Sequence, residues 1–342
     1  NFPTNDFTVT FTEGDNNGQL PASATPALSF RGDATGAGLE YSGTPSWAPS
    51  SDNSALSEPF TISFYINAPL DGPTQQGNTR YIYDTLRLNN IGDGRGLFLR
   101  STSGAWDLHF VDRYALNGAP PTNGLSNTAA TWIFDDFVTA TTATGYGDQL
   151  THVLLTTDGN RSNTQTVQPI VQLYINGVLQ TWSTTPTYPV GDHAGIPVSD
   201  FYIGTNGNFN SFLSYDSDPT ELTILDEVMI FDAHLNTQTK VDEIYNSGYQ
   251  LDHNNLTPLS TYSNLKVFYT FSETNDSVSN GGTIHSRIAN SENLTVVNTT
   301  YLATDGNTYN LIDTANAGPP TAGTIVYHAD FSIVPDNIGS YG

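Results

Sequence analysis

The pattern of apolar and polar positions changes from that of a strand to that of a helix within residues 221–248. Apolar residues spaced as in a strand buried on at least one face come first, at Leu222, Ile224, Val228 and Ile230. Val241, Ile244 and Tyr245 then follow the i, i+3, i+4 spacing of a helix. Thr237 suits the N-cap of this helix, and Gly248 lies where a helix end favours positive φ. The pattern predicts a core strand followed directly by one short helix.

The rest of the chain alternates short apolar runs with segments rich in Asn, Gly and Pro. The clearest strands are expected at 60–66, 80–88, 96–100, 106–111, 152–157, 166–176 and 201–204. Asn176-Gly177, between two apolar runs, predicts a tight hairpin turn. Residues 118–131 are expected to form a long loop because Asn, Pro, Gly, Ala and Ser dominate them. About a dozen short strands and one helix predict an all-β sandwich or jelly roll.

Six landmarks in this pattern resemble those of laminin G-like, concanavalin A-type jelly rolls. They are, in order, Ala27–Asp33 (ALSFRGD), Phe60–Pro69 (FTISFYINAP), Thr151–Gly159 (THVLLTTDG), Val171–Leu179 (VQLYINGVL), Phe201–Gly207 (FYIGTNG) and the closing strand and helix, Asp226–Phe231 with Val241–Tyr245. The chain departs from the family at Tyr65, where Trp is usual, and at Leu150, where a Trp usually precedes the His-Val pair. Tyr114–Asp148 is an insertion.

The resemblance implies three parts of the chain. Residues 1–26 are expected to be an N-terminal arm with a first strand, and residues 27–250 the laminin G-like domain. Residues 251–342 are expected to be a C-terminal extension, made of added strands or of a small subdomain. Within it, Ser263–Glu273 (SNLKVFYTFSE) resembles a segment that often follows the helix in bacterial and phage copies of the domain.

Charge and composition limit the classes of partner that are expected. Asp and Glu number 34 against 10 Lys and Arg, which gives a net charge of −24. Nucleic acids and anionic membranes are therefore not expected as partners, since both favour a cationic surface. The sequence contains no run of 18 apolar residues, so membrane insertion is not expected. The chain has no Cys, so disulfides and thiolate chemistry are excluded. With scarce Lys and abundant Asn and Thr, the composition favours an extracellular bacterial or viral protein, secreted, at the cell surface or on a virion.

Asp226 is the first candidate for a site residue. In laminin G-like domains the Asp of this strand often helps to bind Ca²⁺, and the resemblance implies Asp33 as a second ligand. Backbone carbonyls and water would complete the six to eight oxygens that Ca²⁺ takes. The alternative is that Asp226 caps a turn or accepts hydrogen bonds from backbone amides near the helix. Glu227 is expected on the opposite face, exposed to solvent or paired with an Arg.

Candidate carbohydrate contacts come from two other segments. Asn206, Asp216 and Asp218 belong to an Asn/Asp-rich loop suited to a sugar or a second cation, and the alternative is a solvated loop. Trp132 and Tyr146 lie in the insertion and are candidate platforms for a sugar ring, and the alternative is that they pack that segment.

The sequence favours a protein without catalysis. Glucanases of the concanavalin A-type fold carry E-x-D-x-x-E on one strand, and this spacing is absent, as are G-x-S-x-G, H-E-x-x-H and the P-loop. The first hypothesis is a phage virion component, such as a capsid decoration, head-fibre or tail-fibre protein, built on a lectin-like jelly roll. The alternative is a secreted bacterial Ca²⁺-dependent carbohydrate-binding module, with a glycan-active hydrolase or lyase below both. Expected partners are a cell-surface glycan, neighbouring capsid or fibre subunits, and further copies of the chain.

Overall fold

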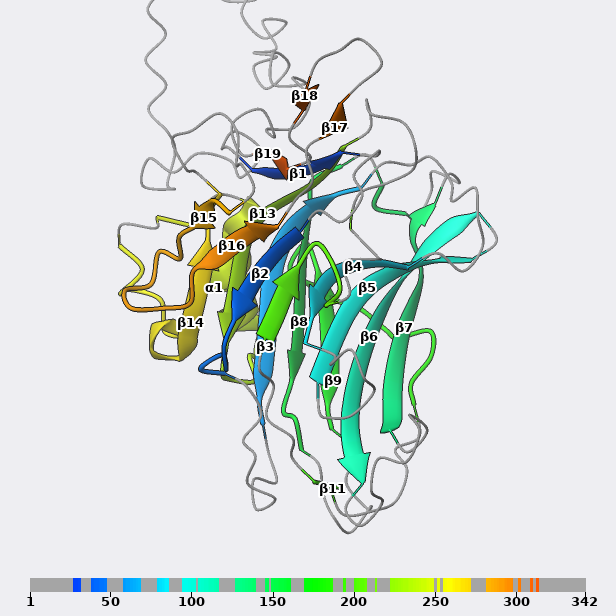
Figure 1. Cartoon of the computed structure of the whole chain (residues 1–342). Helices are drawn as coiled ribbons and strands as arrows, with labels where there is room; N and C mark the ends of the chain where they lie inside the picture. The colour runs from blue at the N-terminus through cyan, green and yellow to red at the C-terminus, as the bar shows by residue number, and fades with distance from the viewer. Residues whose placement is uncertain are drawn as a thin grey trace, which may run out of the picture.

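The structure of the chain is a computed structural model, which describes residues 27–31, 38–47, 58–68, 79–85, 94–102, 104–116, 127–139, 145–147, 149–160, 169–186, 193–194, 200–207, 213, 222–248, 251–252, 255–271, 281–297, 301–302, 308–309 and 312–313. Two large antiparallel sheets and one short α-helix make up most of this part (Figure 1). The all-β sandwich predicted from the sequence is confirmed. No helix in the described ranges is long and apolar enough to cross a membrane.

The first sheet has eight strands and is built around the predicted closing strand. Its order is β10 (Val178–Leu179), β9 (Val171–Ile175), β8 (Thr151–Thr157), β3 (Phe60–Asn67), β13 (Leu222–Phe231), β1 (Leu28–Arg31) and β19 (Ile312–Asp313), with β14 (Leu265–Tyr269) also pairing with β13. Strand β13 therefore holds β3, β1 and β14 together.

The second sheet has nine strands. Its order is β11 (His193–Ala194), β6 (Ala105–Leu116), β5 (Gly94–Thr102), β4 (Thr79–Asp84), β12 (Asp200–Ile203), β2 (Gly38–Ser42), β16 (Leu294–Val297) and β15 (Thr283–Ile284), with β7 (Asn127–Thr139) also pairing with β6. Figure 1 shows β5, β6 and β7 side by side, away from α1 and β14. The prediction of a loop over 118–131 is wrong for residues 127–131, because they begin β7 and pair with β6. A separate ribbon joins β17 (Tyr301–Leu302) and β18 (Thr308–Tyr309).

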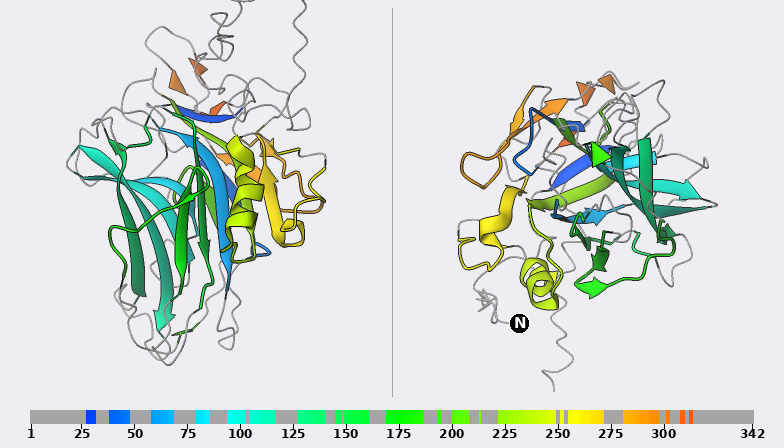
Figure 2. Two further views of the ribbon diagram at one scale, coloured as in Figure 1. Left: turned by 180° about the vertical axis from the view of Figure 1, so that it is seen from behind. Right: turned by 90° about the horizontal axis from the view of Figure 1, so that it is seen from below.

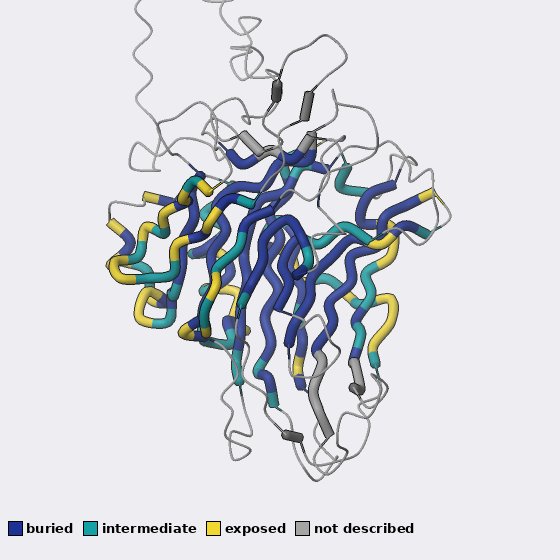
Figure 3. Tube along the Cα trace, in the orientation of Figure 1, coloured by how far each residue is buried: buried dark blue, intermediate teal, exposed yellow. Residues whose placement is uncertain are grey.

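Apolar side chains fill the space between the two sheets. Phe64 on β3 and Leu155 on β8 belong to this core, together with Leu97 on β5 and Leu108 on β6, and all four are fully buried. Alternate residues of each strand point to this side, as the pleat of a strand requires. The central strands are consequently buried along most of their lengths (Figure 3).

A second apolar cluster covers the other face of the eight-stranded sheet. Leu154 and Met229 project from β8 and β13 and pack under Val241 and Ile244 of α1 (Gln238–Tyr245). Figure 2 shows α1 lying along this sheet, next to β14. Because both faces are covered, β3 and β8 read as continuous buried strands rather than as alternating ones. The strands that follow the helix join both sheets, β14 the first and β15 with β16 the second.

The ends of α1 differ in part from the prediction. Thr237 is the N-cap as expected, with extended backbone, but its side chain makes no capping hydrogen bond. The C-cap is Asn246 in the left-handed region, at φ 46°, two residues before Gly248, the position for which positive φ was predicted. A short 3₁₀ turn, η2 (Asn246–Gly248), follows, and Gly248 has φ 85° within it. The second 3₁₀ turn, η3 (Tyr262–Asn264), precedes β14.

The hairpin predicted at Asn176-Gly177 is confirmed. The two residues have φ of 49° and 76° and connect β9 directly to β10. Positive φ at both central positions is the type I′ geometry, which Asn-Gly adopts at little cost. The Asn176 Oδ1 also accepts a hydrogen bond from the His152 backbone N–H at 2.9 Å, which ties the turn to β8.

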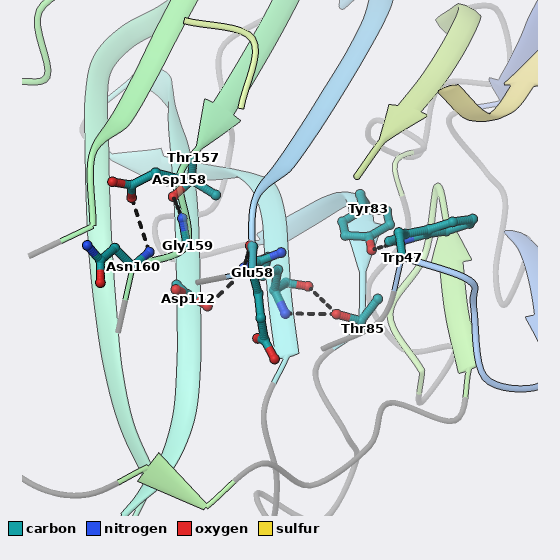
Figure 4. A network of polar contacts seen from close by, with 10 residues as sticks. Trp47, Glu58, Tyr83, Thr85, Asp112, Thr157, Asp158, Gly159 and Asn160 are labelled. Atoms are coloured by element: carbon teal, nitrogen blue, oxygen red, sulfur yellow. Dashed lines mark hydrogen bonds and ion pairs between the residues drawn. The ribbon is translucent and has the colours of Figure 1, made fainter. Parts of the chain in front are cut away.

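A buried arginine, Arg95, holds one end of the sandwich together, and its partners Glu58 and Asp112 are labelled in Figure 4. The Arg95 Nη2 donates to the Glu58 carbonyl oxygen at 2.7 Å, and its Nε lies 3.6 Å from the Asp112 Oδ1. The guanidinium also lies 5.1 Å from the centre of the Phe60 ring. Next to it, the Glu58 backbone N–H donates to the Gly159 carbonyl oxygen at 3.3 Å. Strands from both sheets therefore meet at a single charged side chain.

Candidate functional site

The closing strand carries a β-bulge at the predicted site residue. The register between β13 and β3 shifts between Asp226 and Met229, and Glu227 has φ of 48°. In a regular strand, Asp226 and Glu227 would point to opposite faces, but the bulge adds a residue and redirects the side chain. Both residues have an exposed fraction of 0%. The prediction that Glu227 faces solvent is therefore wrong, and the reason is a bulge that the local sequence does not encode.

The two carboxyl groups lie in a polar cluster covered by the end of α1. The Asp226 Oδ1 accepts a hydrogen bond from the Glu227 backbone N–H at 2.8 Å, as the backbone-amide alternative for Asp226 describes. Burial raises the pKa of Glu227 well above its ordinary value, and the neighbouring Asp226 charge raises it further. The backbone of Leu251 opposes this rise, but no donor in the described ranges reaches hydrogen-bond geometry with either carboxyl oxygen. Glu227 is thus held as a buried acid that resists ionisation.

Aromatic rings and a histidine complete this cluster. The Tyr65 hydroxyl donates to the Tyr245 carbonyl oxygen at 3.0 Å, and burial with the nearby Glu227 raises the pKa of Tyr65. The His152 ring lies between Tyr65 and Tyr245, at 4.9 Å and 5.3 Å between ring centres. Its Nε2 shares a hydrogen bond of 2.8 Å with the Ser63 hydroxyl, and burial lowers the pKa of His152 to about 3. Ser63, Tyr65 and His152 are buried and Tyr245 is half-buried, so the cluster supports the packing of α1.

The calcium site predicted at Asp33 and Asp226 stays a prediction. Asp33 lies outside the described residues. Within the described ranges, no group of three or more His, Cys, Asp or Glu side chains is arranged to hold a metal ion. Asp226 and Glu227 provide two adjacent carboxyl groups, and further oxygens would have to come from backbone carbonyls or from water.

The predicted carbohydrate contacts are not gathered in one place. Trp132 on β7 is 4% exposed and packs on Phe110 in the core between the sheets, at 5.6 Å between ring centres, as the packing alternative describes. Tyr146 is half-buried against Phe137, at 5.6 Å. Asn206 follows β12, and β6, β5 and β4 lie between that strand and β7. Asp216 and Asp218 lie outside the described residues.

A row of aromatic rings crosses three neighbouring strands on the outer face of the nine-stranded sheet. Tyr81 on β4 lies 5.0 Å from Phe98 on β5, and Phe98 stacks on His109 of β6 at 5.3 Å and 13°. The three residues are paired across the strands, Tyr81 with Phe98 and Phe98 with His109. Tyr81 is partly exposed, whereas Phe98 and His109 are 8% and 5% exposed. We call Tyr81, Phe98 and His109 the aromatic row.

One end of the aromatic row carries polar groups. Burial lowers the pKa of His109, which therefore stays neutral at neutral pH, and no hydrogen-bond partner in the described ranges reaches its Nε2. Asp107, two residues before it, accepts hydrogen bonds from the Thr102 hydroxyl at 2.5 Å and the Asp136 backbone N–H at 2.9 Å. Arg100 pairs across the strands with Asp107 and is exposed. The row thus ends in a neutral imidazole and is flanked by an exposed guanidinium.

Carboxylates lie toward β2 and β12 on the same face. The Tyr202 hydroxyl donates to the Glu40 Oε1 at 3.5 Å, and Asp200 accepts from the Gly43 backbone N–H at 3.2 Å. Burial raises the pKa of Glu40, and the Asp200 charge adds to the rise. Across the strands, Tyr202 pairs with Asp84, which in turn accepts the Gly207 backbone N–H at 3.0 Å. This group was missed in the sequence because only the register of β2, β12 and β4 brings its members together.

The aromatic row could have been suspected from the alternation of two strands. In β5, Phe98 lies between the core residues Leu97 and Leu99, and in β6, His109 lies between Leu108 and Phe110. An aromatic side chain at the position of an alternating strand that faces away from the core is such a signal. The signal is weak for one strand and becomes specific only when neighbouring strands align.

No protein-family model and no curated protein matches the chain. Among solved structures, mouse laminin alpha1 domains LG4-5 match at 10% identity with a TM-score of 0.34, covering 61% of this chain and 43% of that one. The Ruminococcus gnavus IT-sialidase CBM40 bound to alpha2,3 sialyllactose matches at 13% identity and 0.31, covering 64% and 96%. Alginate lyase vAL-1 from Chlorella virus matches at 9% identity and 0.29, covering 56% and 83%.

A laminin LG domain pair is thus among the neighbours, and it is the class that the sequence resemblance predicted. The matches include both binding domains and a lyase. At these identities and scores, none of them carries information on what this chain binds or whether it is an enzyme. Evidence on both points has to come from the residues of the chain itself.

Proposed function

We propose that the protein is a non-catalytic, surface-displayed glycan-binding protein whose ligand lies along the outer face of the nine-stranded sheet. The observation that carries the proposal is the aromatic row, in which Phe98 stacks on His109 and the partly exposed Tyr81 lies tilted against Phe98, at positions of β4, β5 and β6 that face away from the core. Aromatic faces bind the apolar C–H surface of a sugar ring through burial and dispersion. Rings aligned across strands suit an extended saccharide better than a single sugar.

The polar groups around the row favour a neutral or an amino sugar. Arg100 and Asp107 at one end, and Glu40 and Asp200 at the other, offer donors and acceptors for hydroxyl groups. The whole chain has a net charge of −24, so an anionic polysaccharide would meet a repulsive field. A few placed polar groups around apolar contacts are the usual composition of a small-ligand site.

The setting that we propose is a virion, as a capsid decoration, head-fibre or tail-fibre protein, with a secreted bacterial module as the alternative. The support is the resemblance of Ser263–Glu273 to phage copies of the domain, together with the absence of Cys and the scarcity of Lys. Mass spectrometry of purified particles tests this setting. If the protein is absent from the particles and present in the culture medium, the secreted module is favoured.

The experiment is a glycan-array screen of the whole chain, in calcium and in chelator, followed by titration of the best ligand. Tyr81→Ala removes the partly exposed ring of the row and is expected to weaken binding about tenfold, which corresponds to about 1.4 kcal/mol. Tyr262→Ala, which removes an exposed tyrosine of η3 on the other sheet's side, is the matched control and is expected to bind as the parent does. Equal affinity for the parent and Tyr81→Ala, or a blank array, contradicts the proposed surface.

One observation favours a hydrolase as the second candidate. Glu40 and Asp200 lie on the same outer face, and the charge of Asp200 helps to raise the pKa of Glu40. A carboxyl group whose pKa is raised beside a second carboxyl group is the arrangement of the acid in glycosidases. Assays for new reducing ends, run on each bound glycan, test this candidate. Turnover that is lost in Glu40→Gln would replace the non-catalytic proposal.

A further inference from the structure

The edge of the eight-stranded sheet exposes an unusual amount of apolar surface. Strand β10 is the outermost strand, and its Val178 and Leu179 are 62% and 52% exposed. Ile170, immediately before β9, is 55% exposed. In the described part of the chain only one other large hydrophobic residue, Tyr262, is exposed. We call Ile170, Val178 and Leu179, with the backbone of residues 178–181, the β10 edge.

Apart from the shortness of β10, this edge lacks the usual protection of an edge strand. Natural edges are blunted by charged residues, proline or bulges, because unpaired backbone groups attract other strands. Residues 162–191 contain no Asp, Glu, Lys or Arg, although the chain has a net charge of −24. Strand β10 pairs with β9 in regular register and carries no proline. Its ladder is short, but the Gln180 backbone N–H continues it by donating to the Leu173 carbonyl oxygen at 2.8 Å.

The backbone of β10 is oriented for a further strand. Along an antiparallel strand, the hydrogen-bonding groups of successive residues point alternately to the two sides. Because Gln180 points back toward Leu173, the N–H and C=O of Leu179 point away from the sheet. An added antiparallel strand would pair with these groups while its side chains met Val178 and Leu179.

We propose that the β10 edge is a self-association surface, at which two copies of the chain pair their β10 strands antiparallel about a twofold axis. A twofold axis places each strand antiparallel to its own copy and sets apolar side chains against identical ones. The two eight-stranded sheets would then continue into each other. The contact is small, so the dimer is expected to be weak rather than obligate.

Charge identifies a second copy as the occupant. Two chains of −24 repel each other, and they can approach closely only where carboxylates are absent, as they are over the described residues 169–186. Two carboxylates of the described residues lie beside this surface. Asp158 accepts the Ile170 backbone N–H at 2.8 Å, and Asp242 accepts the Gln238 side chain, which also donates to the Gly177 carbonyl oxygen. A cationic partner protein would find no carboxylate within the edge itself, and an anionic membrane would be repelled by the rest of the chain.

Sedimentation velocity of the whole chain over a concentration series tests the proposal. Monomer and dimer in exchange are expected, with more dimer at high salt, since salt screens the repulsion between the carboxylates beside the edge. The double variant Val178→Lys, Leu179→Lys is expected to be monomeric at every concentration and salt. The matched control Tyr262→Lys places the same charge on the other exposed apolar residue and is expected to dimerise as the parent does.

Two further measurements keep the test decisive if the lysine variant folds poorly. Val178→Thr with Leu179→Thr preserves strand propensity and is expected to weaken the dimer severalfold while melting as the parent does. In the parent, backbone amides of residues 178–181 should exchange more slowly as concentration rises. A parent that is monomeric at all concentrations and salts overturns the proposal, as does a dimer that persists in both double variants. Neither result bears on glycan binding, which is proposed on the other sheet.

Discussion

Replacing Glu227 by Gln tests whether the buried acid of the bulge is a net cost to the fold at neutral pH. The carboxyl is fully buried beside Asp226, and its pKa is raised well above the ordinary 4.5. Below pH 4.5 both the folded and the unfolded chain keep the proton. As the pH rises above 4.5, the unfolded chain releases it and the folded chain does not, so the free energy of unfolding falls.

The linkage fixes the size of this effect. Each pH unit over which only the folded chain keeps the proton costs about 1.4 kcal/mol. In Glu227→Gln the titrating group is gone, and the amide can donate to the Asp226 carboxylate. The variant is therefore expected to match the parent at pH 4 and to exceed its stability at pH 7, by on the order of 1–3 kcal/mol.

Urea denaturation at a series of pH values, followed by tryptophan fluorescence, measures the difference directly. Glu292→Gln is a suitable control, because the Glu292 Oε1 accepts a hydrogen bond from the Ser46 backbone N–H that an amide oxygen can keep. A Glu227→Gln variant that is less stable than the parent at pH 7, with the same pH slope, would refute the reasoning. It would mean that Glu227 is ionised in the fold and held there by a positive partner.

Three further predictions follow from the geometry. Burial lowers the pKa of His152 to about 3 from its ordinary 6.5, so the stabilisation by neutral His152 is complete above pH 6.5 and is lost as the pH drops toward 3. His152→Gln is expected to flatten this dependence of the melting temperature on pH, and an unchanged dependence contradicts the prediction. Gly159→Ala is expected to cost several kcal/mol in urea unfolding, since φ is 58° and a Cβ would lie 2.0 Å from the Glu58 carbonyl oxygen; a loss below about 1 kcal/mol would show that the loop yields. If Asp33 and Asp226 bind calcium, the parent is expected to melt at a higher temperature in calcium than in chelator, whereas Asp226→Ala is expected to melt at the same temperature in both. Identical melting curves of the parent in calcium and in chelator would contradict the site.

Periodicity predicted the elements whose environment is set by their own sequence. The strand and helix of 222–245 were found because Val241 and Ile244 pack on one face and the strand ends before them. The hairpin at Asn176-Gly177 was found because few other dipeptides accept positive φ twice. The start of β7 was missed because residues 127–131 are Asn, Thr and Ala, which show no strand-like apolar alternation, and their strand conformation depends on pairing with β6.

The candidate site was harder to predict because it depends on the exact register between neighbouring strands. Tyr81, Phe98 and His109 adjoin only through two ladders of consecutive strands, and the register of the β4–β5 ladder includes a shift between Tyr81 and Tyr83. The burial of Glu227 depends on a bulge, which is a property of two strands together rather than of either alone. Trp132 was chosen for its type and its place in an insertion, whereas its ring packs in the core.

The position of β13 between β1 and β3 has a consequence for how the chain folds during synthesis. Leu28 pairs with Leu225, and Ile62 with Ile230, so the earliest strands of the first sheet lack their central neighbour until residue 231 has left the ribosome. Strand β2 lacks its neighbour β16 for longer, since Leu39 pairs with Val296. Such distant pairings make folding slow and leave apolar strand edges exposed meanwhile. The net negative charge of the nascent chain and its abundant Asn and Thr therefore limit aggregation with other chains until the last strands have been synthesised.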